Sequence, residues 1–157
     1  QLIDFARRRA QVEELRYEEP IGIEALTKSV TDNIQQYTQM GGVRPFGAAL
    51  LIGGVSNGEP RLFETDPSGT PNEWKAVAIG SDRSDIQTYL EEHWTPELTL
   101  EAGIDLALEA LRRTREEDFD ASGLAVAVIE TETGAYRELD AATIGEHLEN
   151  IDTEADE

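Results

Sequence analysis

The sequence predicts an α+β fold in which helices pack against a layered β-sheet. Two observations support this prediction. Segments with the 3.6-residue period of amphipathic helices alternate with groups of short strand-like segments. Two of the strand-like segments, residues 46–52 and 124–129, are apolar at every position, whereas a strand with one face in solvent alternates apolar and polar residues. We therefore expect both strands to be covered on two faces, by helices and by a second sheet.

Two helices are predicted before the first strand. The first has no capping residue ahead of its apolar positions, so it is expected to begin upstream of Gln1. Its apolar residues recur at roughly helical spacing: Leu2, Phe5, Ala6, Ala10 and Val12. After Pro20, a second helix is expected over residues 23–37, because one of its faces is apolar, and Met40-Gly41-Gly42 should end it.

Three strands are predicted to follow as an antiparallel meander, over residues 46–52, 61–65 and 73–79. The tripeptide Ser56-Asn57-Gly58 separates the first two strands. The tetrapeptide DPSG at residues 66–69 separates the second and third. Its proline presets φ and its glycine can close the chain reversal, so this stretch is a strong turn signal.

Two more helices are predicted in the second half of the chain. One runs from Gly80-Ser81 to His93, with the Ser81 side chain as its expected cap. The next begins after Thr99, which can cap it, and has the clearest helical period in the chain. Its apolar face consists of Leu100, Ile104, Ala107, Leu108 and Leu111. Arginines follow at its C-terminal end, where the helix dipole favours cations: Arg112, Arg113 and Arg115.

The last predicted elements are two strands and a helix. Strands over residues 124–129 and 135–139 flank the turn Glu132-Thr133-Gly134, and a short helix is expected over residues 141–150. The sequence contains neither internal repeats nor a domain linker. It therefore predicts one domain over residues 1–151, followed by a disordered acidic tail over residues 152–157.

The chain is strongly acidic, with 33 aspartates and glutamates against 13 lysines and arginines, a net charge of −20 and a pI near 4.3. Such a charge repels phosphate backbones, so no nucleic-acid partner is expected. A disordered acidic chain would lack the regular aliphatic segments described above. A folded protein can carry this charge where molar salt shrinks the Debye length to roughly 3 Å. We therefore expect a cytoplasmic protein of a halophile.

Other classes of protein are disfavoured by what the sequence lacks. No apolar run reaches the ~18 residues of a membrane-spanning helix. The absence of cysteine rules out disulfides, thiolate metal sites and a cysteine nucleophile. His93 and His147 are the only histidines, and neither has a neighbour at metal-ligand spacing, so both are expected to be surface residues. No cofactor or metal ion is expected.

Six segments form an ordered set of motifs: QQYTQ at residues 35–39, GVRPFG at 42–47, AALLIGGV at 48–55, DPSG at 66–69, KAVAIGS at 75–81 and LTLEAGIDLALEAL at 98–111. Together these motifs resemble proteasome α-type subunits of the archaeal kind, and the charge suggests a haloarchaeal one. The order of the motifs is more specific than any single motif. The resemblance extends to about Ile151 and begins inside the family's domain, whose N-terminal part is missing here.

This resemblance implies a four-layer αββα sandwich of the N-terminal nucleophile hydrolase type, of which the chain holds the C-terminal portion. It also implies partners. In the family, seven α subunits form a ring that caps the inner rings of β subunits, templates their assembly and restricts substrate entry. The α ring also receives a regulatory AAA ATPase that unfolds substrates. The family's docking pocket for the ATPase lies mainly upstream of this sequence, so no pocket residue is assigned.

The first helix lies at the contact between stacked α and β rings in this family. The resemblance therefore makes Arg7, Arg8 and Arg9 candidate ring-contact residues. A solvated basic face is an alternative interpretation of equal weight.

The resemblance also bears on catalysis. Active subunits of the superfamily use an N-terminal threonine, whereas every threonine of this chain is internal. Catalytic β-type subunits carry an aspartate three residues before a Ser-Gly pair. Here Phe119 occupies that position before Ser122-Gly123, and Asp118 and Asp120 flank it. We therefore expect a non-catalytic subunit. The alternatives are an N-terminally truncated β-type threonine peptidase subunit and a free-standing acidic adaptor domain.

Overall fold

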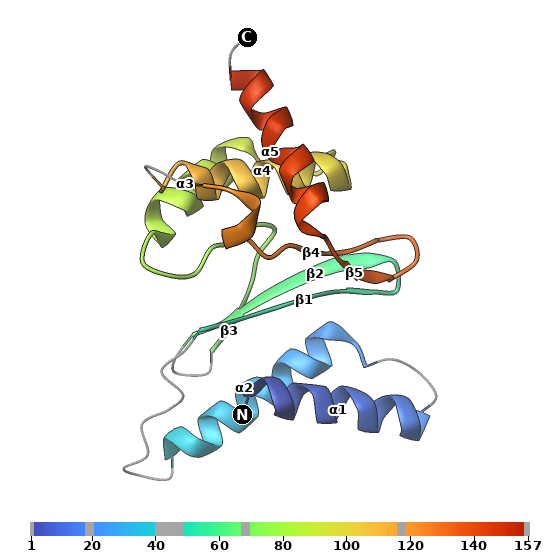
Figure 1. Cartoon of the computed structure of the whole chain (residues 1–157). Helices are drawn as coiled ribbons and strands as arrows, with labels where there is room; N and C mark the ends of the chain where they lie inside the picture. The colour runs from blue at the N-terminus through green and yellow to red at the C-terminus, as the bar shows by residue number, and fades with distance from the viewer. Residues whose placement is uncertain (1, 18–20, 40–48, 67–69, 116–118, 156–157) are drawn as a thin grey trace. The chain divides into compact units, whose positions relative to one another are not determined.

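The computed structural model describes residues 2–17, 21–39, 49–66, 70–115 and 119–155 (Figure 1). These residues belong to two units, Gln1–Lys75 and Ala76–Glu157, each with its own helices, sheet and core. The mixture of helices and antiparallel strands confirms the predicted α+β class. The predicted helix end at 40–42 and the GVRPFG motif at 42–47 lie outside the described residues.

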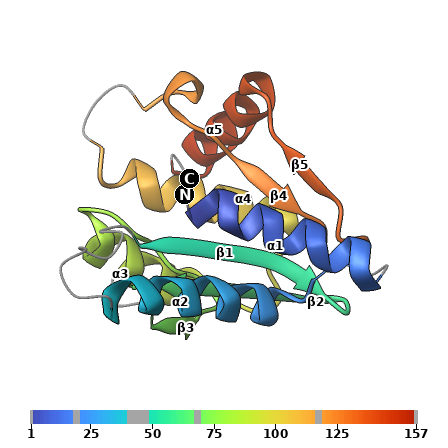
Figure 2. The same ribbon diagram turned by 90° about the horizontal axis from the view of Figure 1, so that it is seen from below.

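In the first unit, the residues that the structure describes form two helices and a three-stranded sheet: α1 (Leu2–Tyr17), α2 (Ile23–Gln39), β1 (Leu50–Ser56), β2 (Glu59–Thr65) and β3 (Pro71–Glu73). The strands are antiparallel and follow the order β1-β2-β3, which confirms the predicted meander. Helices α1 and α2 lie side by side on one face of this sheet (Figure 1 and Figure 2).

A two-residue turn joins β1 to β2. Ser56 and Glu59 form the last pair of the ladder, and Asn57 and Gly58 connect them. Both connecting residues have positive φ, 53° and 77°, a conformation that asparagine and glycine adopt more readily than other residues. This kind of turn matches the right-handed twist of the two strands and fixes their register.

Val30 of α2 lies at the centre of the core of the first unit. Its side chain is 0% exposed and packs against Phe5 and Ala6 of α1 and against Leu50 and Ile52 of β1. Leu50 and Ile52 reach the same core because alternate side chains of a strand share a face. The helices thus cover one face of β1.

The opposite face of β1 carries Leu51, which lies between the two core residues and is 40% exposed. The expected cover of this face by a second sheet stays a prediction. An unbroken apolar run indicates a strand, but it does not by itself show that a second layer covers its other face.

The third strand also lies earlier in the chain than predicted. β3 ends at Glu73, and one further backbone hydrogen bond, 2.9 Å long, runs from the Trp74 N–H to the Leu62 carbonyl. Residues 74–79 form no strand. The side chain of Gln87 satisfies part of their backbone instead: its Oε1 accepts from the Ala78 N–H (3.1 Å), and its Nε2 donates to the Ala76 carbonyl (3.2 Å). The side chain of a helix residue here supplies the backbone hydrogen bonds that a neighbouring strand would otherwise provide.

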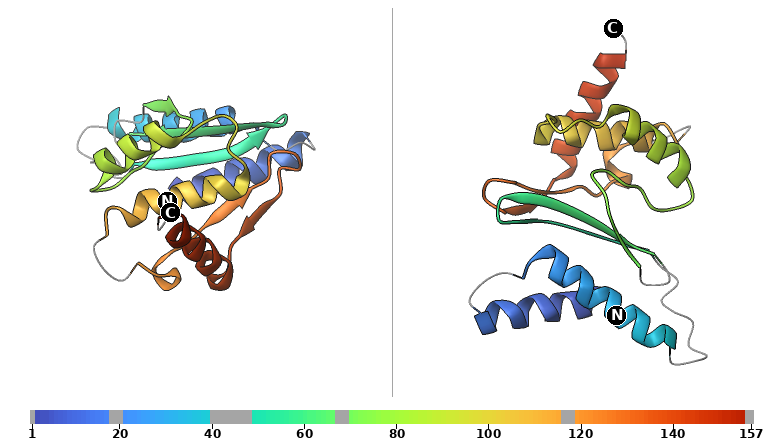
Figure 3. Two further views of the ribbon diagram at one scale, coloured as in Figure 1. Left: turned by 90° about the horizontal axis from the view of Figure 1, so that it is seen from above. Right: turned by 180° about the vertical axis from the view of Figure 1, so that it is seen from behind.

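The described residues of the second unit form three α-helices, a short 3₁₀ helix and a two-stranded antiparallel sheet: α3 (Arg83–His93), α4 (Leu100–Arg112), η1 (Ala121–Gly123), β4 (Ala127–Ile129), β5 (Tyr136–Glu138) and α5 (Ala141–Ala155). Helix α4 packs against both α3 and α5 (Figure 3). As predicted, the Thr99 side chain caps α4, where its hydroxyl oxygen accepts a hydrogen bond from the Ala102 N–H (3.1 Å).

Two apolar clusters make up the core of the second unit. Ile104 and Leu108 of α4 pack with Val128 of β4 and Ile151 of α5. On another side of α4, Ala110 packs with two buried residues of α3, Ile86 and Leu90. Helix α4 is therefore apolar over a wider arc than the single face that the sequence predicted.

The strand predicted over residues 124–129 is shorter than expected and has one exposed face. Leu124, Val126 and Val128 turn towards the core, whereas Ala125 and Ala127 are exposed. The expected cover of this second face by another layer stays a prediction. The alanine side chain is apolar but small, so its exposure to solvent costs little. An apolar run that contains alanine therefore does not distinguish a half-exposed strand from a buried one.

Helix α5 extends further than predicted. Its first turn is capped by Asp140, whose Oδ1 accepts a hydrogen bond from the Thr143 N–H (2.8 Å), and this bond is the main cause that lowers the pKa of the Asp140 carboxyl. The helix continues to Ala155 and so includes residues expected to form a frayed tail. The division into one domain over residues 1–151 and a disordered tail over 152–157 stays a prediction.

Candidate functional site

The candidate ring-contact residues Arg7, Arg8 and Arg9 lie in helix α1, and all three are exposed. Successive residues of an α-helix are separated by about 100° around its axis, so three consecutive side chains spread over roughly 200°. The structure therefore places these cations on neighbouring sides of the helix and not on a single face.

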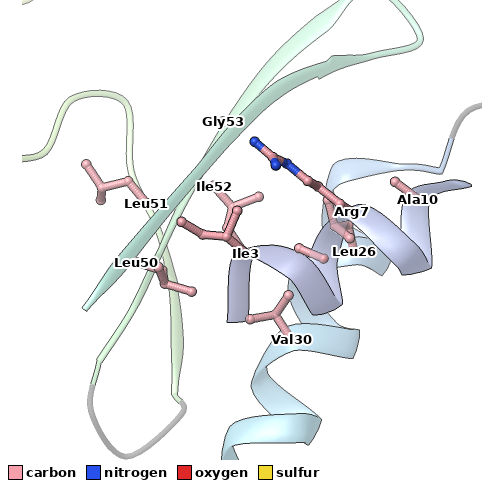
Figure 4. A pocket seen from close by; sticks show the side chains of 10 residues that line it. Ile3, Arg7, Ala10, Leu26, Val30, Leu50, Leu51, Ile52 and Gly53 are labelled. Carbon is pink, nitrogen blue, oxygen red and sulfur yellow. The ribbon is translucent and has the colours of Figure 1, made fainter. Parts of the chain in front are cut away.

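An open apolar depression of about 310 Å³ lies between α1, α2 and β1 (Figure 4). Small residues of α1 leave this space in front of the strand. The side chain of Arg7 extends from α1 towards β1 near Gly53, at one side of the depression. The lining residues are Ile3, Ala6, Arg7 and Ala10 of α1, Leu26 and Val30 of α2, and Leu50, Leu51, Ile52 and Gly53 of β1.

The chemistry of this depression is that of a contact surface. Among the described residues that line it, Arg7 is the only ionisable one, and none carries a carboxylate, imidazole or hydroxyl group. An arginine remains charged and can pair with a carboxylate, but it does not exchange protons near neutral pH. The depression can therefore accept apolar side chains and an acidic group, and it lacks a general base or a nucleophile.

The Ser-Gly pair that the sequence singled out forms part of a local turn. The Oδ1 of Asp120 accepts hydrogen bonds from the Ser122 N–H (2.8 Å) and from the Ser122 hydroxyl, and it caps η1. The hydroxyl bond, followed by the backbone N–H groups of Ser122 and Gly123, lowers the pKa of the Asp120 carboxyl. The aspartate is thereby held ionised by its own turn, and the Ser122 hydroxyl is engaged as a donor.

Contrary to the prediction, Ser81 does not cap helix α3. The N-cap position belongs to Asp82, and no side-chain hydrogen bond caps the helix there. Ser81 is exposed and lies one residue further upstream, after Gly80 with a φ of 113°. The positive φ of Gly80 sets the direction of the chain into the helix, so the serine falls outside the capping position.

The two histidines have different surroundings. His93 is exposed, as predicted, and its ring stacks on Tyr89 with a centroid separation of 4.1 Å. The prediction of a surface position is wrong for His147, which is 6% exposed. Its ring lies between two carboxylates of α4, with Nδ1 2.6 Å from Asp105 Oδ1 and Nε2 3.1 Å from Glu101 Oε2. The only trace of this contact in the sequence is the i, i+4 spacing of Glu101 and Asp105, which places both carboxylates on one face of α4.

Sequence reasoning also missed the contacts of Arg61 on β2. Its guanidinium binds Glu73 of β3 through Nε and Nη2, at 2.5 and 3.0 Å, and lies 3.5 Å from a carboxylate oxygen of Glu24 in α2. The Arg61 side chain is the largest cause that lowers the pKa of the Glu73 carboxyl. This pair was not predicted, because the sequence predicts a third strand that begins at residue 73, whereas β3 ends there. Its role is to tie β2 to β3 and to α2.

Further classes of site are not observed in the described ranges. No group of three His, Cys, Asp or Glu residues could hold a metal ion within them. No helix among the described residues is long and apolar enough to cross a membrane.

Comparison with known proteins gives a consistent result. The family model described as proteasome subunit matches residues 1–129. The chain is 61% identical over 160 residues to proteasome subunit alpha 1 of Haloferax volcanii, with 100% of this chain and 64% of that protein covered. It is 59% identical over 155 residues to proteasome subunit alpha of Halobacterium salinarum, with 99% and 61% covered.

A third relative is proteasome subunit alpha 1 of Haloarcula marismortui, which is 57% identical over 152 residues, with 97% of this chain and 58% of that protein covered. The chain thus spans between 58% and 64% of the length of these three relatives. Because the family model covers most of the sequence, and because the similar proteins are α subunits, this chain belongs to the proteasome subunit family and is of the α type.

Proposed function

We propose that this chain is the C-terminal part of a non-catalytic α subunit, which forms a seven-membered ring in the proteasome core particle and restricts substrate entry. The observation that supports this proposal is the 57–61% identity to haloarchaeal α subunits over almost the whole chain. The complete subunit would have the four-layer αββα fold and act in the cytoplasm in protein degradation. Its mechanism is exclusion of folded proteins and the binding of partners.

The proposed non-catalytic role is supported by Phe119, which stands where catalytic β-type subunits carry an aspartate. Asp120 and Ser122 are engaged with each other in a capping turn. A β-type peptidase would instead need a terminal threonine with a free amine.

The proposed partners are other α subunits, β subunits and a regulatory AAA ATPase. A closed ring requires heterologous interfaces, in which one patch of a subunit meets a different patch of its neighbour. We propose neither nucleic acid nor a membrane as a partner, because the net charge of −20 opposes binding to phosphates and anionic lipids.

The proposed contact with the β ring is the exposed surface of α1. Three of the 13 cationic residues of this acidic chain, Arg7, Arg8 and Arg9, are consecutive there. Arg7 adjoins the apolar depression, so this surface can bind an apolar side chain next to a carboxylate. Such a combination buries apolar area and pairs one charge, which is typical of the centre of a protein interface.

Charge reversal on α1 tests this contact. The complete natural subunit would be expressed with its β subunits in molar KCl, and the fraction of protein in the assembled particle measured by sedimentation. We expect Arg7→Glu to lower the association constant of the α and β subunits by roughly tenfold or more. The substitution replaces an attraction between the arginine and an acidic group of the partner with a repulsion between two negative charges. Lys28→Glu is the matched control, since Lys28 is also exposed in the first unit but lies on α2. Equal assembly of both variants and the unchanged subunit would exclude α1 as the contact.

Two assays test the assignment as a whole. The complete chain alone should hydrolyse no peptide substrate, and turnover that depends on a threonine would identify a β-type peptidase instead. A stable monomer that never joins β subunits would support the acidic adaptor alternative.

A further inference from the structure

A buried imidazole ring forms part of the contact between helices α5 and α4. His147 lies in the middle of α5, and both of its ring nitrogens face carboxylates of α4. Nδ1 is 2.6 Å from Asp105, which is partly exposed, and Nε2 is 3.1 Å from Glu101, whose side chain is 68% exposed. His147 itself is 6% exposed, so little of its surface is available to water.

The protonation state follows from counting donors. An ionised carboxylate only accepts hydrogen bonds, whereas a neutral imidazole donates from one nitrogen and has a lone pair on the other. A neutral His147 would therefore satisfy one carboxylate and direct a lone pair at the other. The imidazolium cation donates from both nitrogens and satisfies both carboxylates. Two carboxylates within ion-pair distance also favour the cation electrostatically.

We propose that His147 is an imidazolium cation that locks α5 onto α4, so that the docking of α5 depends on pH. When the ring loses its proton to solvent, one carboxylate loses its donor and the two helices lose an ion pair. Glu101 can turn into solvent, but the buried ring nitrogen cannot follow it. Alkaline conditions then loosen the contact of α5 with α4 and with Ile151 in the apolar core beneath it.

The other charged groups on the packed elements either have partners elsewhere or are exposed. On α4, Arg112 binds Glu109 (2.5 Å) and also Asp152 of α5. On the side of η1, Asp120 accepts from Ser122. Strand β4, which contributes Val128 to the same core, contains no ionisable residue. Glu146 and Glu149 flank His147 on α5 and are exposed. Among the described residues, Asp105 and Glu101 are the groups at ion-pair distance from His147.

The same geometry separates this site from a metal or catalytic centre. A metal ligand or a general base needs an imidazole nitrogen with an available lone pair. Here both nitrogens are occupied by carboxylates on opposite sides of the ring. The carboxylates therefore do not converge on a common point at which an ion could be held.

The test compares thermal unfolding of the complete natural subunit in molar KCl at about pH 6 and about pH 9, on either side of the range in which histidine ordinarily titrates. The variants are His147→Gln and, as a matched control, His93→Gln, which alters the exposed histidine. We expect His147→Gln to lower the Tm by roughly 3–8 °C at the acidic pH. This difference from the unchanged protein should fall to less than half at the alkaline pH. His93→Gln should follow the unchanged protein at both.

A second variant keeps the proposal testable if His147→Gln does not fold. In Glu101→Gln, the amide NH₂ can donate to a neutral Nε2, so the alkaline form regains a partner. The decrease in Tm between the two pH values should then be smaller than in the unchanged protein. A pH-independent effect of His147→Gln, or a Glu101→Gln variant with an unaltered pH dependence, would overturn the proposal and leave His147 as a packing residue.

Discussion

The hydroxyl oxygen of Ser56 accepts a hydrogen bond from the backbone N–H of Ile23, at 3.0 Å. Ser56 ends strand β1, and Ile23 begins helix α2, so a strand residue caps a helix 33 positions away in sequence. The first N–H groups of a helix have no partner within it, and a side chain from another element can supply one. This bond sets the start of α2 against the sheet of the first unit.

Removing this hydroxyl should destabilise the subunit. Ser56→Ala leaves the Ile23 N–H without its acceptor, and we expect a loss of about 1 kcal/mol in the free energy of unfolding. Urea denaturation of the complete chain measures it. Ser81→Ala is the control, because Ser81 is exposed and caps no helix, and its effect should stay within about 0.5 kcal/mol. Equal losses in the two variants would contradict the capping role.

A side chain at position 54 should collide with the same end of α2. A Cβ on Gly54 would lie 2.2 Å from Cδ1 and 2.7 Å from Cγ1 of Ile23. We expect Gly54→Ala to cost about 1–3 kcal/mol, because a β-branched isoleucine has few alternative rotamers. The cost should be smaller in an Ile23→Val background, which lacks Cδ1, and a double-mutant cycle measures this coupling. Gly145→Ala is the control, since open space surrounds that glycine in α5.

The helices of this protein were predictable because their signals are local. Thr99 precedes an apolar period that matches α4, and its capping bond is present. The third strand was not predictable in the same way. Residues 76–79 have a strand-like composition, but Gln87 of α3 binds their backbone in place of a strand. A glutamine in a helix carries no local mark of that role.

The contacts of the candidate sites likewise depend on residues that are far apart in the sequence. His147 and Asp105 are 42 residues apart, so the burial of His147 depends on how α5 packs on α4 and not on its neighbours in sequence. Arg7, Arg8 and Arg9 lie in the predicted helix α1, and their role in a ring contact stays a prediction. The depression beside Arg7 arises only when α2 and β1 come together with α1.

Acid should weaken the start of helix α5. Hydrogen bonds from the Thr143 N–H and then the Thr143 hydroxyl lower the pKa of Asp140 below its ordinary value of 3.8. A carboxyl with a lowered folded-state pKa contributes stability above the unfolded pKa, and this contribution is lost as the pH falls through the folded pKa.

Asp140→Asn keeps a capping oxygen and removes the titration, so this variant should lose less stability than the unchanged protein below about pH 4. Circular dichroism during acid titration checks this. Asp82→Asn is the matched control, because Asp82 holds the N-cap position of α3 without a side-chain cap bond. If Asp140→Asn and the unchanged protein lose stability in parallel, Asp140 does not contribute in this way.

Removing salt should destabilise the subunit. The net charge of −20 makes self-repulsion large when the Debye length rises from roughly 3 Å at molar salt to about 10 Å at 0.1 M. We expect the Tm to fall steadily as KCl is diluted over this range. Thermal melts in KCl and in sucrose of matched osmolarity separate charge screening from solvent exclusion. A Tm independent of KCl would contradict a halophilic adaptation of the surface.

Electron microscopy of the complete natural subunit, purified alone in molar KCl, tests most directly whether this chain is part of an α subunit that forms a ring. We predict rings with seven-fold symmetry that hydrolyse no peptide until β subunits are added. Particles that remain monomeric, or rings that cleave peptides on their own through a threonine, would contradict it.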